Sequence, residues 1–357
     1  MLGAIIGDLV GSTYEATNVK TKDFPLLTRM SRISDDSIMT LAVCQIIQEG
    51  LQYDKKEIAY KLKEWARAYP DRGYGELFID WALSDDMKPY GSRGNGAPMR
   101  ISPVGWYAKT KEEVKEWSRS ITEVTHNTKE AIRAAEVVAM CIFYARRGKS
   151  KEYIKDYASK YYDLNLDYQD LVDDYEFDCS CNGSVPEAIY CFLISNSFLD
   201  CLRTAISIGG DSDTIACIAC SIAEAYYKHI NPQLLEKMHE NIPEGIPNPV
   251  EVIEQFMYDM EDDFVTSEAL TDKHYIIYVE EEGRGFYGHS KRLIVLKDYI
   301  LARLDRSGFN RMKRVRLMLK EVNSLETLMD VISDINELAS DYGISFRLYR
   351  NRIEANL

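Results

Sequence analysis

Gly209-Gly210-Asp211-Ser212-Asp213-Thr214 places two glycines, two carboxylates and two hydroxyls directly before an apolar run, Ile215–Tyr227. The glycines predict a tight turn in which the backbone can approach a ligand closely, and the apolar run predicts a buried helix. Carboxylates this close together repel one another unless a cation lies among them. Mg²⁺ and Mn²⁺ prefer oxygen ligands of this kind, so the stretch indicates a divalent metal site at a helix N-terminus.

A second cluster, Ser34-Asp35-Asp36-Ser37, also opens an apolar helix, Ile38–Ile47. Ser and Asp are the commonest helix N-caps, so this cluster taken alone fits a cap better than a set of metal ligands. The later stretch is harder to explain in that way, because a cap needs one Asp and this stretch offers two. If the two clusters meet in the fold, they form one binuclear metal site.

Patterns of helical period fill the chain up to about residue 262, and strand signals are almost absent there, so we expect an all-α body. Gly3, Gly7 and Gly11 recur four residues apart in the first apolar segment, and on a helix they form one smooth face against which another backbone can pack closely. An acidic connector, not a helix, is expected at Asp163–Asp178. Besides the two helices that follow the acidic clusters, the expected helices are Leu2–Val10, Asp54–Tyr69, Leu77–Leu83, Glu112–Val124, Lys129–Arg146, Lys151–Tyr162, Val185–Leu193, Leu199–Ile208 and Val250–Asp262.

A glycine-rich segment, Tyr90–Arg100, lies between two of these helices and contains Gly94-Asn95-Gly96. Pro98 suits the first turn of a helix, so we expect a glycine loop that leads into a helix N-terminus. Such a loop presents free backbone N–H groups to an anion. The segment matches neither a P-loop nor a dinucleotide fingerprint, and on its own it is a weak signal for phosphate binding.

The 357 residues exceed what one core normally holds, so we expect two units. No apolar run approaches the roughly 18 residues that span a bilayer. The apolar start of the chain lacks a basic region and contains Asp8, so a secretory signal is not expected. Eight cysteines in such a chain indicate reduced thiols in a cytoplasmic protein.

Residues 272–357 differ from the body in pattern and in charge. They hold 15 Lys and Arg against 13 Asp and Glu, whereas residues 1–271 hold 28 against 44. The acidic body argues against general nucleic-acid binding. Arg303–Lys320 holds seven basic residues and one acid, so a basic face that binds an acidic partner remains open. We expect a small α+β accessory domain here. Its expected strands are Tyr275–Val279, Met312–Leu319 and Ile344–Tyr349, and its expected helices are Lys291–Leu304 and Leu325–Ser340.

Five motifs follow one another along the chain: Gly7-Asp8 with Gly11-Ser12-Thr13-Tyr14-Glu15, Ser34-Asp35-Asp36-Ser37, Gly94-Asn95-Gly96-Ala97-Pro98-Met99-Arg100, Thr125-His126 and Gly209-Gly210-Asp211-Ser212-Asp213-Thr214. Taken together they resemble the motifs of the ADP-ribosylglycohydrolase family, which includes ADP-ribosylhydrolases and the dinitrogenase reductase-activating glycohydrolase. The resemblance covers about residues 1–265. It implies an orthogonal multi-helix, all-α fold with two Mg²⁺ or Mn²⁺ ions in a cleft.

The resemblance also implies roles for individual residues. The hydroxyls and carboxylates of the two acidic clusters are the expected metal ligands: Ser34, Asp35, Asp36, Asp211, Asp213 and Thr214. The glycine loop and one histidine are expected to bind the ADP-ribose phosphates: Gly94, Asn95, Gly96 and His126. Serine stands at positions 34 and 212, where the family commonly has threonine. It keeps the hydroxyl and loses a methyl group.

The activity that the resemblance implies is hydrolysis of the glycosidic bond at ribose C1″ of an ADP-ribosylated protein or small compound. Cleavage develops positive charge at C1″, and two cations can hold the ribose hydroxyls and a water. The leaving group needs a proton and the water must lose one. Glu15 is the first choice for the residue near the scissile bond, and Asp36 or Asp211 is the second. Which residue is the acid and which is the base stays open.

Two other functions remain compatible with the sequence. One is a non-catalytic ADP-ribose-binding or structural protein on the same fold, although all four carboxylates of the metal site and Glu15 are present. The other is an immunity or partner-binding protein whose tail recognises a toxin or target. The sequence does not decide whether ADP-ribose is attached to arginine, serine, a nucleobase or an acyl group.

Overall fold

The computed structural model describes residues 1–228, six positions from residue 230 to residue 242, and five strands between residues 274 and 356. The chain forms two compact units, Met1–Asp263 and Phe264–Leu357. Three expected elements lie outside the described residues: the helices Val250–Asp262 and Leu325–Ser340 and the strand Met312–Leu319.

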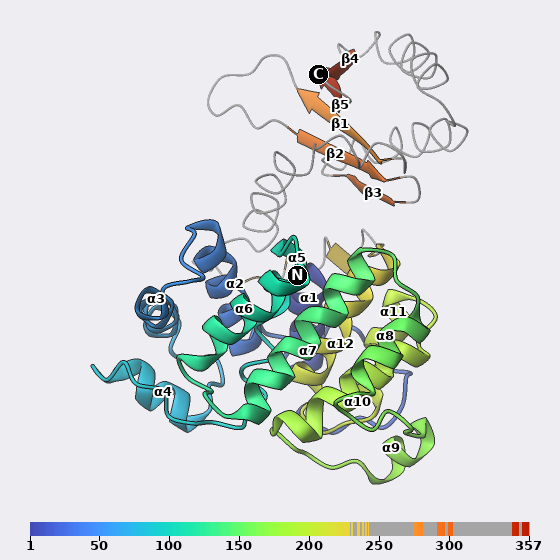
Figure 1. Cartoon of the computed structure of the whole chain (residues 1–357). Coiled ribbons are helices and arrows are strands. Elements are labelled where there is room, and N and C mark those ends of the chain that lie inside the picture. The colour runs from blue at the N-terminus through green and yellow to red at the C-terminus, as the bar shows by residue number, and fades with distance from the viewer. Residues whose placement is uncertain are drawn as a thin grey trace. The chain divides into compact units, whose positions relative to one another are not determined.

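In the first unit, every regular element among the described residues is a helix, which confirms the all-α prediction. Helix α12 is central to the unit, because it contacts α1, α2, α5, α7, α10 and α11 (Figure 1). The helices are α1 (Leu2–Gly11), α2 (Asp35–Gln48), α3 (Lys55–Ala68), α4 (Glu76–Leu83), α5 (Ser102–Tyr107), α6 (Lys111–Glu123), α7 (Lys129–Arg146), α8 (Lys151–Ala158), α9 (Tyr168–Asp174), α10 (Cys181–Ile194), α11 (Phe198–Ser207) and α12 (Ser212–Tyr227).

Helices α1 and α12 pack against each other along a face made of glycines. A Cβ atom on Gly3 would lie 2.3 Å from the carbonyl oxygen of Cys220, and one on Gly11 would lie 2.5 Å from the Cα of Asp213. Gly7 meets the α12 backbone just as closely. Side chains cannot come this near to a backbone, so the predicted glycine face is confirmed. The contact brings the end of α1 to the beginning of α12.

Two local predictions in this unit are wrong. Asp163–Asp178 is not a plain connector, because it contains α9. Its many acids hide the helical period, but Asp167 caps the helix by accepting hydrogen bonds from two amides of the first turn. Pro98 does not open a helix, because residues 95–100 form turns and α5 begins after them. The first-turn position of that helix is occupied by Pro103 instead.

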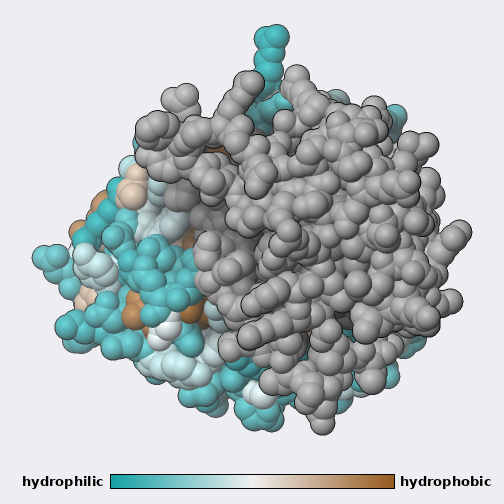
Figure 2. Space-filling view, turned by 90° about the horizontal axis from the view of Figure 1, so that it is seen from above, coloured by the Kyte–Doolittle hydropathy of each residue, from teal (hydrophilic) through white to brown (hydrophobic). Residues whose placement is uncertain are grey.

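The interior of the first unit is apolar and its described surface is mostly hydrophilic. Helices α7 and α12 are buried along most of their length. Figure 2 shows hydrophobic residues only in small groups on the part of the surface that it colours. Among the described helices, none is long and apolar enough to cross a membrane. All eight cysteines are free thiols, and only Cys179 is exposed.

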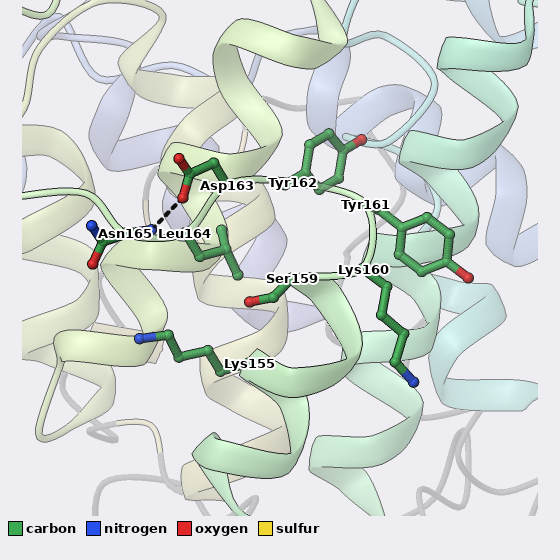
Figure 3. A pocket seen from close by; sticks show the side chains of 8 residues that line it. All are labelled: Lys155, Ser159, Lys160, Tyr161, Tyr162, Asp163, Leu164 and Asn165. Carbon is green, nitrogen blue, oxygen red and sulfur yellow. Dashed lines mark hydrogen bonds between the residues drawn. The ribbon is translucent and has the colours of Figure 1, made fainter.

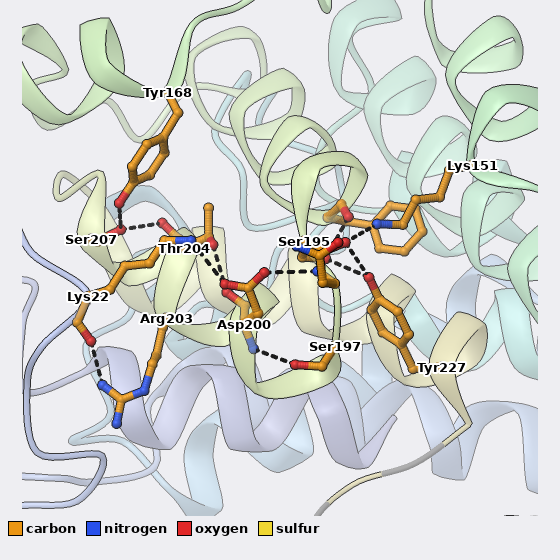
Figure 4. A network of polar contacts seen from close by, with 12 residues as sticks. Lys22, Lys151, Tyr168, Ser195, Ser197, Asp200, Arg203, Thr204, Ser207 and Tyr227 are labelled. Carbon is orange, nitrogen blue, oxygen red and sulfur yellow. Dashed lines mark hydrogen bonds and ion pairs between the residues drawn. The ribbon is translucent and has the colours of Figure 1, made fainter.

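Polar contacts hold α11, the helix that leads into the Gly209-Gly210 turn (Figure 4). Arg203 donates a hydrogen bond to the carbonyl oxygen of Lys22, in the loop that follows α1. Near the end of the helix, the hydroxyls of Tyr168 and Ser207 lie 2.8 Å apart. These contacts fix the direction in which the chain enters the turn.

The second unit contains a five-stranded sheet with the order β3-β2-β1-β5-β4. Strands β1 and β5 are parallel, and the other neighbouring pairs are antiparallel. The strands are β1 (His274–Glu280), β2 (Lys291–Leu296), β3 (Tyr299–Ala302), β4 (Ser345–Tyr349) and β5 (Arg352–Asn356).

The strands predicted at Tyr275–Val279 and Ile344–Tyr349 are confirmed as β1 and β4. The helix predicted at Lys291–Leu304 is wrong, because this segment forms β2 and β3. Its apolar runs are short, and periodicity alone does not separate a short buried strand from a piece of buried helix. The β-branched Ile294 and Val295 favour a strand.

Candidate metal centre

Three helix ends bring two groups of carboxylates together. Asp8 on α1, Asp36 at the start of α2 and Asp213 at the start of α12 each offer an oxygen, and these oxygens lie within 4.8 Å of one another. Glu15, Asp211 and Asp213 form a second group by the same criterion. Asp213 belongs to both groups, so they are adjacent. The two acidic clusters of the sequence therefore meet in the fold.

A direct hydrogen bond joins the two clusters. The hydroxyl of Thr214 donates to Oδ2 of Asp36 at 3.1 Å. Ser34 is the N-cap of α2, since its hydroxyl oxygen accepts a hydrogen bond from the amide of Asp36 at 3.2 Å. Ser212 does not face the acids; its hydroxyl donates to the carbonyl oxygen of Gly11 and fastens the start of α12 to the end of α1.

Asp36 carries the clearest sign that the centre suits a cation. Its Oδ1 atom is buried and has no hydrogen-bond partner among the described residues. A buried carboxylate oxygen without a partner costs about 1–3 kcal/mol or more. A cation in contact with this oxygen would remove that cost, so the site fits a divalent metal ion.

Asp8 was not among the expected site residues, although it belongs to one of the two groups. Its carboxylate is fully buried and accepts hydrogen bonds from the amide of Ser34 at 3.0 Å, from the amide of Ser37 at 3.1 Å and from the Ser37 hydroxyl. It therefore holds the N-terminus of α2, where the predicted ligands lie. The signal in the sequence was one acid inside an otherwise apolar helix.

The turn before α12 is held by the loop that follows α1. Gly209 and Gly210 both have positive φ, at 74° and 70°. Lys20 donates to the carbonyl oxygen of Ile208 at 2.7 Å, and the side-chain oxygen of Asn18 accepts a hydrogen bond from the amide of Gly210 at 2.9 Å. A Cβ atom on Gly209 would lie 1.9 Å from that oxygen, so only glycine fits there.

The glycine loop lies directly beside this turn. Asn95 donates from Nδ2 to Oδ2 of Asp211 at 2.7 Å and to the hydroxyl oxygen of Ser184 at 2.9 Å. Asp211 is the N-cap residue of α12, but its side chain makes no capping hydrogen bond. Gly94 forms an isolated bridge with Ser180, which holds the loop against the start of α10. The side chain of Asn95, expected at the phosphates, is thus bonded to a predicted metal ligand.

His126 lies against the same loop, as expected. It is buried, and a Cβ atom on Gly96 would lie 3.4 Å from its Nε2 atom. Burial, followed by the charge of Arg100, lowers the pKa of His126 well below its usual value. The ring is therefore neutral at pH 7.

Asp35 and Glu15 lie at the margins of the centre. Asp35 belongs to neither carboxylate group, and its Oδ1 atom is 3.6 Å from the place of a Cβ on Gly73, in the loop before α4. Glu15 follows α1 and is partly exposed. Burial, followed by the charge of Asp211, raises the pKa of Glu15. The structure thus brings Glu15 to the edge of the acids and leaves Asp35 slightly apart.

The centre is short of positive charge. Burial is the largest cause that raises the pKa of Asp8 to about 6, that of Asp35 to about 8, and those of Asp36 and Asp213 well above the usual range. Neighbouring carboxylates are the next cause for the last three. Among the described residues, no Lys or Arg forms an ion pair with any of them.

An open pocket of about 470 Å³ lies elsewhere, between the end of α8 and the segment that follows it (Figure 3). Two lysines, Lys155 and Lys160, and one acid, Asp163, are among its lining residues, and none of the carboxylates of the centre is. It is therefore distinct from the candidate metal centre.

The helical body of the chain is similar to known proteins. A family model described as ADP-ribosylglycohydrolase matches residues 1–272. The chain belongs to this family. Membership supports a hydrolase that removes ADP-ribose. It also confirms the resemblance drawn from the five motifs.

Relatives in the ADP-ribosylglycohydrolase family are distant in sequence. Human ADP-ribosylhydrolase ARH3 is 26% identical over 306 aligned residues, which cover 64% of this chain and 84% of that protein. ADP-ribosylarginine hydrolase Tri1 of Pseudomonas putida is 23% identical over 273 residues, 67% of this chain and 72% of that protein. A solved structure called ADP-ribosylglycohydrolase-related protein complex has a TM-score of 0.55 at 23% identity, covering 72% of this chain and 95% of its own, and so shares the fold.

Proposed function

We propose that this member of the ADP-ribosylglycohydrolase family cleaves the glycosidic bond at ribose C1″ of an ADP-ribosylated substrate, with two Mg²⁺ or Mn²⁺ ions. The observation that carries the proposal is the meeting of buried carboxylates at the ends of α1, α2 and α12, where an oxygen of Asp36 has no hydrogen-bond partner within the described part of the chain. Bound ions would supply the positive charge that the acids lack and would orient the ribose hydroxyls and a water.

The proposed metal ligands are those of the two acidic clusters. Carboxylate and hydroxyl oxygens suit hard divalent ions, and the donor set contains no sulfur or imidazole. Asp8 is left out, because its Oδ2 atom accepts hydrogen bonds from the amides of Ser34 and Ser37, and its Oδ1 atom accepts a longer one from the amide of Ser34. The ligands are Ser34, Asp35, Asp36, Asp211, Asp213 and Thr214.

Glu15 is the proposed proton-transfer group. It is partly exposed at the edge of the carboxylate groups, where it can meet a substrate that does not enter the buried centre. Burial raises the pKa of Glu15, and this is the direction of shift that a general acid requires. Asp36 and Asp211 are the second choice for the residue near the scissile bond.

The glycine loop is the proposed diphosphate site. A hydrogen bond from the side chain of Asn95 joins the loop to Asp211. A diphosphate bound to the loop would therefore place the attached ribose near the acids. His126 faces the loop at Gly96. Gly96 and His126 are proposed to contact the ADP-ribose phosphates directly. Gly94 and Asn95 are proposed to shape the loop, because their amides donate to the Ser92 hydroxyl oxygen and to the Cys179 carbonyl oxygen.

A panel of ADP-ribosylated substrates tests the function. Release of free ADP-ribose would be measured from arginine-, serine-, nucleobase- and acyl-linked substrates, with Mg²⁺, with Mn²⁺ and with chelator. The arginine-linked substrate comes first, because Tri1 is named an ADP-ribosylarginine hydrolase. Metal-dependent release from any of them supports the proposal. Tight binding of ADP-ribose without release from any substrate would identify a binding protein instead.

A further inference from the structure

Arg100, Thr125 and His126 form an unbroken line of hydrogen bonds beside the glycine loop. Arg100 donates from Nη2 to the hydroxyl oxygen of Thr125 at 2.7 Å, and this oxygen lies 2.8 Å from Nδ1 of His126. All three side chains are buried. Their contacts are sheltered from water, which strengthens each bond and makes an unmade bond costly.

The direction of the bond between Thr125 and His126 follows from the other acceptors nearby. The hydroxyl proton of Thr125 can point to Nδ1 of His126 at 2.8 Å or to the carbonyl oxygen of Thr122 at 3.4 Å. The Thr122 oxygen already accepts the amides of Thr125 at 3.2 Å and His126 at 2.9 Å, which uses both of its lone pairs. Arg100 has only donors, so it leaves the proton of Thr125 free. That proton therefore goes to Nδ1.

A neutral imidazole that accepts at Nδ1 carries its proton on Nε2. The Nε2 atom faces the glycine loop, since a Cβ atom on Gly96 would lie 3.4 Å from it. The ring of Tyr90 packs edge-on against the imidazole, with the ring centroids 5.6 Å apart, and so limits its rotation. The ring thus presents one fixed N–H group to this loop.

We propose that Arg100 and Thr125 are positioning residues that hold His126 as the neutral Nε2–H tautomer, so that Nε2 donates a hydrogen bond to the diphosphate of ADP-ribose on the glycine loop. The identity of the anion rests on the proposed function. The tautomer does not, because it follows from contacts within the chain. The buried N–H group is uncharged, so it recognises the diphosphate through the direction of one hydrogen bond. The charged group of Arg100 contacts the Thr125 hydroxyl, which lies between it and the imidazole.

Nuclear magnetic resonance tests the tautomer directly. Two-bond ¹H–¹⁵N correlation spectra of the full chain at pH 7 distinguish the ring nitrogens, and His126→Gln assigns the signal among the five histidines. The expected spectrum shows a protonated Nε2 and an unprotonated Nδ1. An Nδ1–H or doubly protonated ring overturns the proposal.

Two variants of Thr125 test its positioning role. Thr125→Ser keeps the hydroxyl and should keep the Nε2–H signature, whereas Thr125→Val removes the hydroxyl and should give a mixture of tautomers. A serine variant that loses the signature, or a valine variant that keeps it, shows that the hydroxyl does not set the tautomer. If the valine variant does not fold, the spectra of the serine variant and of the unchanged protein still test whether the ring of His126 carries its proton on Nε2.

Calorimetric titration with ADP-ribose in the presence of Mg²⁺ tests the donor role. Thr125→Val should weaken binding by about 10-fold, as expected when one hydrogen bond to a charged group is lost, and Thr125→Ser should bind like the unchanged protein. His126→Gln should bind better than His126→Asn, because the glutamine amide nitrogen can occupy the place of Nε2. Equal binding by all four variants overturns the donor role. Absence of ADP-ribose binding in the unchanged protein would reject the proposed function, while the spectra still decide the tautomer.

Discussion

Asn95 donates a 2.7 Å hydrogen bond to Asp211 and thereby ties the glycine loop to the first acid of the turn before α12. Its second amide proton goes to Ser184, so both donors of the side chain are used within the protein. The loop proposed to hold the phosphates and the turn proposed to hold metal are therefore parts of one hydrogen-bonded structure. Replacing Asn95 would disturb both.

Removal of one buried carboxylate should abolish metal binding. We expect Asp36→Asn and Asp213→Asn to lose bound Mn²⁺, because each carboxylate belongs to the Asp8–Asp36–Asp213 group and the amide has no charge. Metal content would be measured after dialysis. In the unchanged protein, metal at 100 times its Kd should add about 2.7 kcal/mol to the free energy of unfolding, and chelator should lower the melting temperature. Asp156→Asn, an exposed change on α8, is the control. Full metal content in either site variant contradicts the assignment.

Glu15→Gln should separate turnover from binding. The variant should fold, retain metal and bind ADP-ribose, because Glu15 lies at the edge of the centre and is partly exposed. Turnover should fall by about 100-fold or more, as expected when a positioned proton-transfer group is lost. Steady-state kinetics and ADP-ribose titration measure the two effects. Turnover close to that of the unchanged protein would remove Glu15 from the mechanism, and lost binding would make it a binding residue.

Asp8→Ala should destabilise the protein, with or without metal. The change leaves the amides of Ser34 and Ser37 buried without their acceptor, at a cost of about 2–4 kcal/mol. Asp8→Asn keeps one acceptor oxygen and should lose less. Urea unfolding in the presence of chelator measures both variants. An alanine variant as stable as the unchanged protein would show that Asp8 does not anchor α2.

Glu187 should make the protein less stable as the pH rises. Burial raises its pKa to about 7, and its buried Oε2 atom has no hydrogen-bond partner among the residues that the structure describes. Between about pH 4.5 and pH 7 the folded state holds a proton that the unfolded state has released, so the free energy of unfolding falls as pH rises. Glu187→Gln removes the titrating group and with it this dependence on pH. The variant should be more stable than the unchanged protein at pH 8 by on the order of 2 kcal/mol, with little difference at pH 4. Thermal unfolding at both pH values measures this, and Glu116→Gln, an exposed change on α6, is the control. The same difference at both pH values would contradict it.

The tail should be dispensable for the chemistry. We propose that residues 272–357 form an accessory domain that neither completes the metal centre nor supplies catalytic groups, because the family match ends at residue 272. A protein truncated after Thr271 should hydrolyse a small ADP-ribosylated substrate at an unchanged rate. Slower action on a macromolecular substrate, in a way that added salt reduces, would support recruitment by the basic residues of Arg303–Lys320. An insoluble or metal-free truncated protein would show that the tail belongs to the core.

The sequence by itself determined the helical body and the chemistry of its acids. Helical periodicity is a local property, so most helices of the body were found without tertiary information. The Gly209-Gly210 turn and the glycine face of α1 were found because no other residue fits such positions, at φ of +74° or against a backbone. Local reasoning failed at Lys291–Leu304, where a short apolar run suits either a helix or a strand.

Only the tertiary structure decided which side chains meet. Asp8 looked like a lone acid in an apolar helix, yet packing of α1 against α12 places its carboxylate beside Asp36 and Asp213. Asn95 looked like a residue for a phosphate, and its amide is bonded to Asp211. These contacts join residues many positions apart in the chain. They depend on how helices pack, and that depends on the whole set of buried surfaces rather than on any one segment.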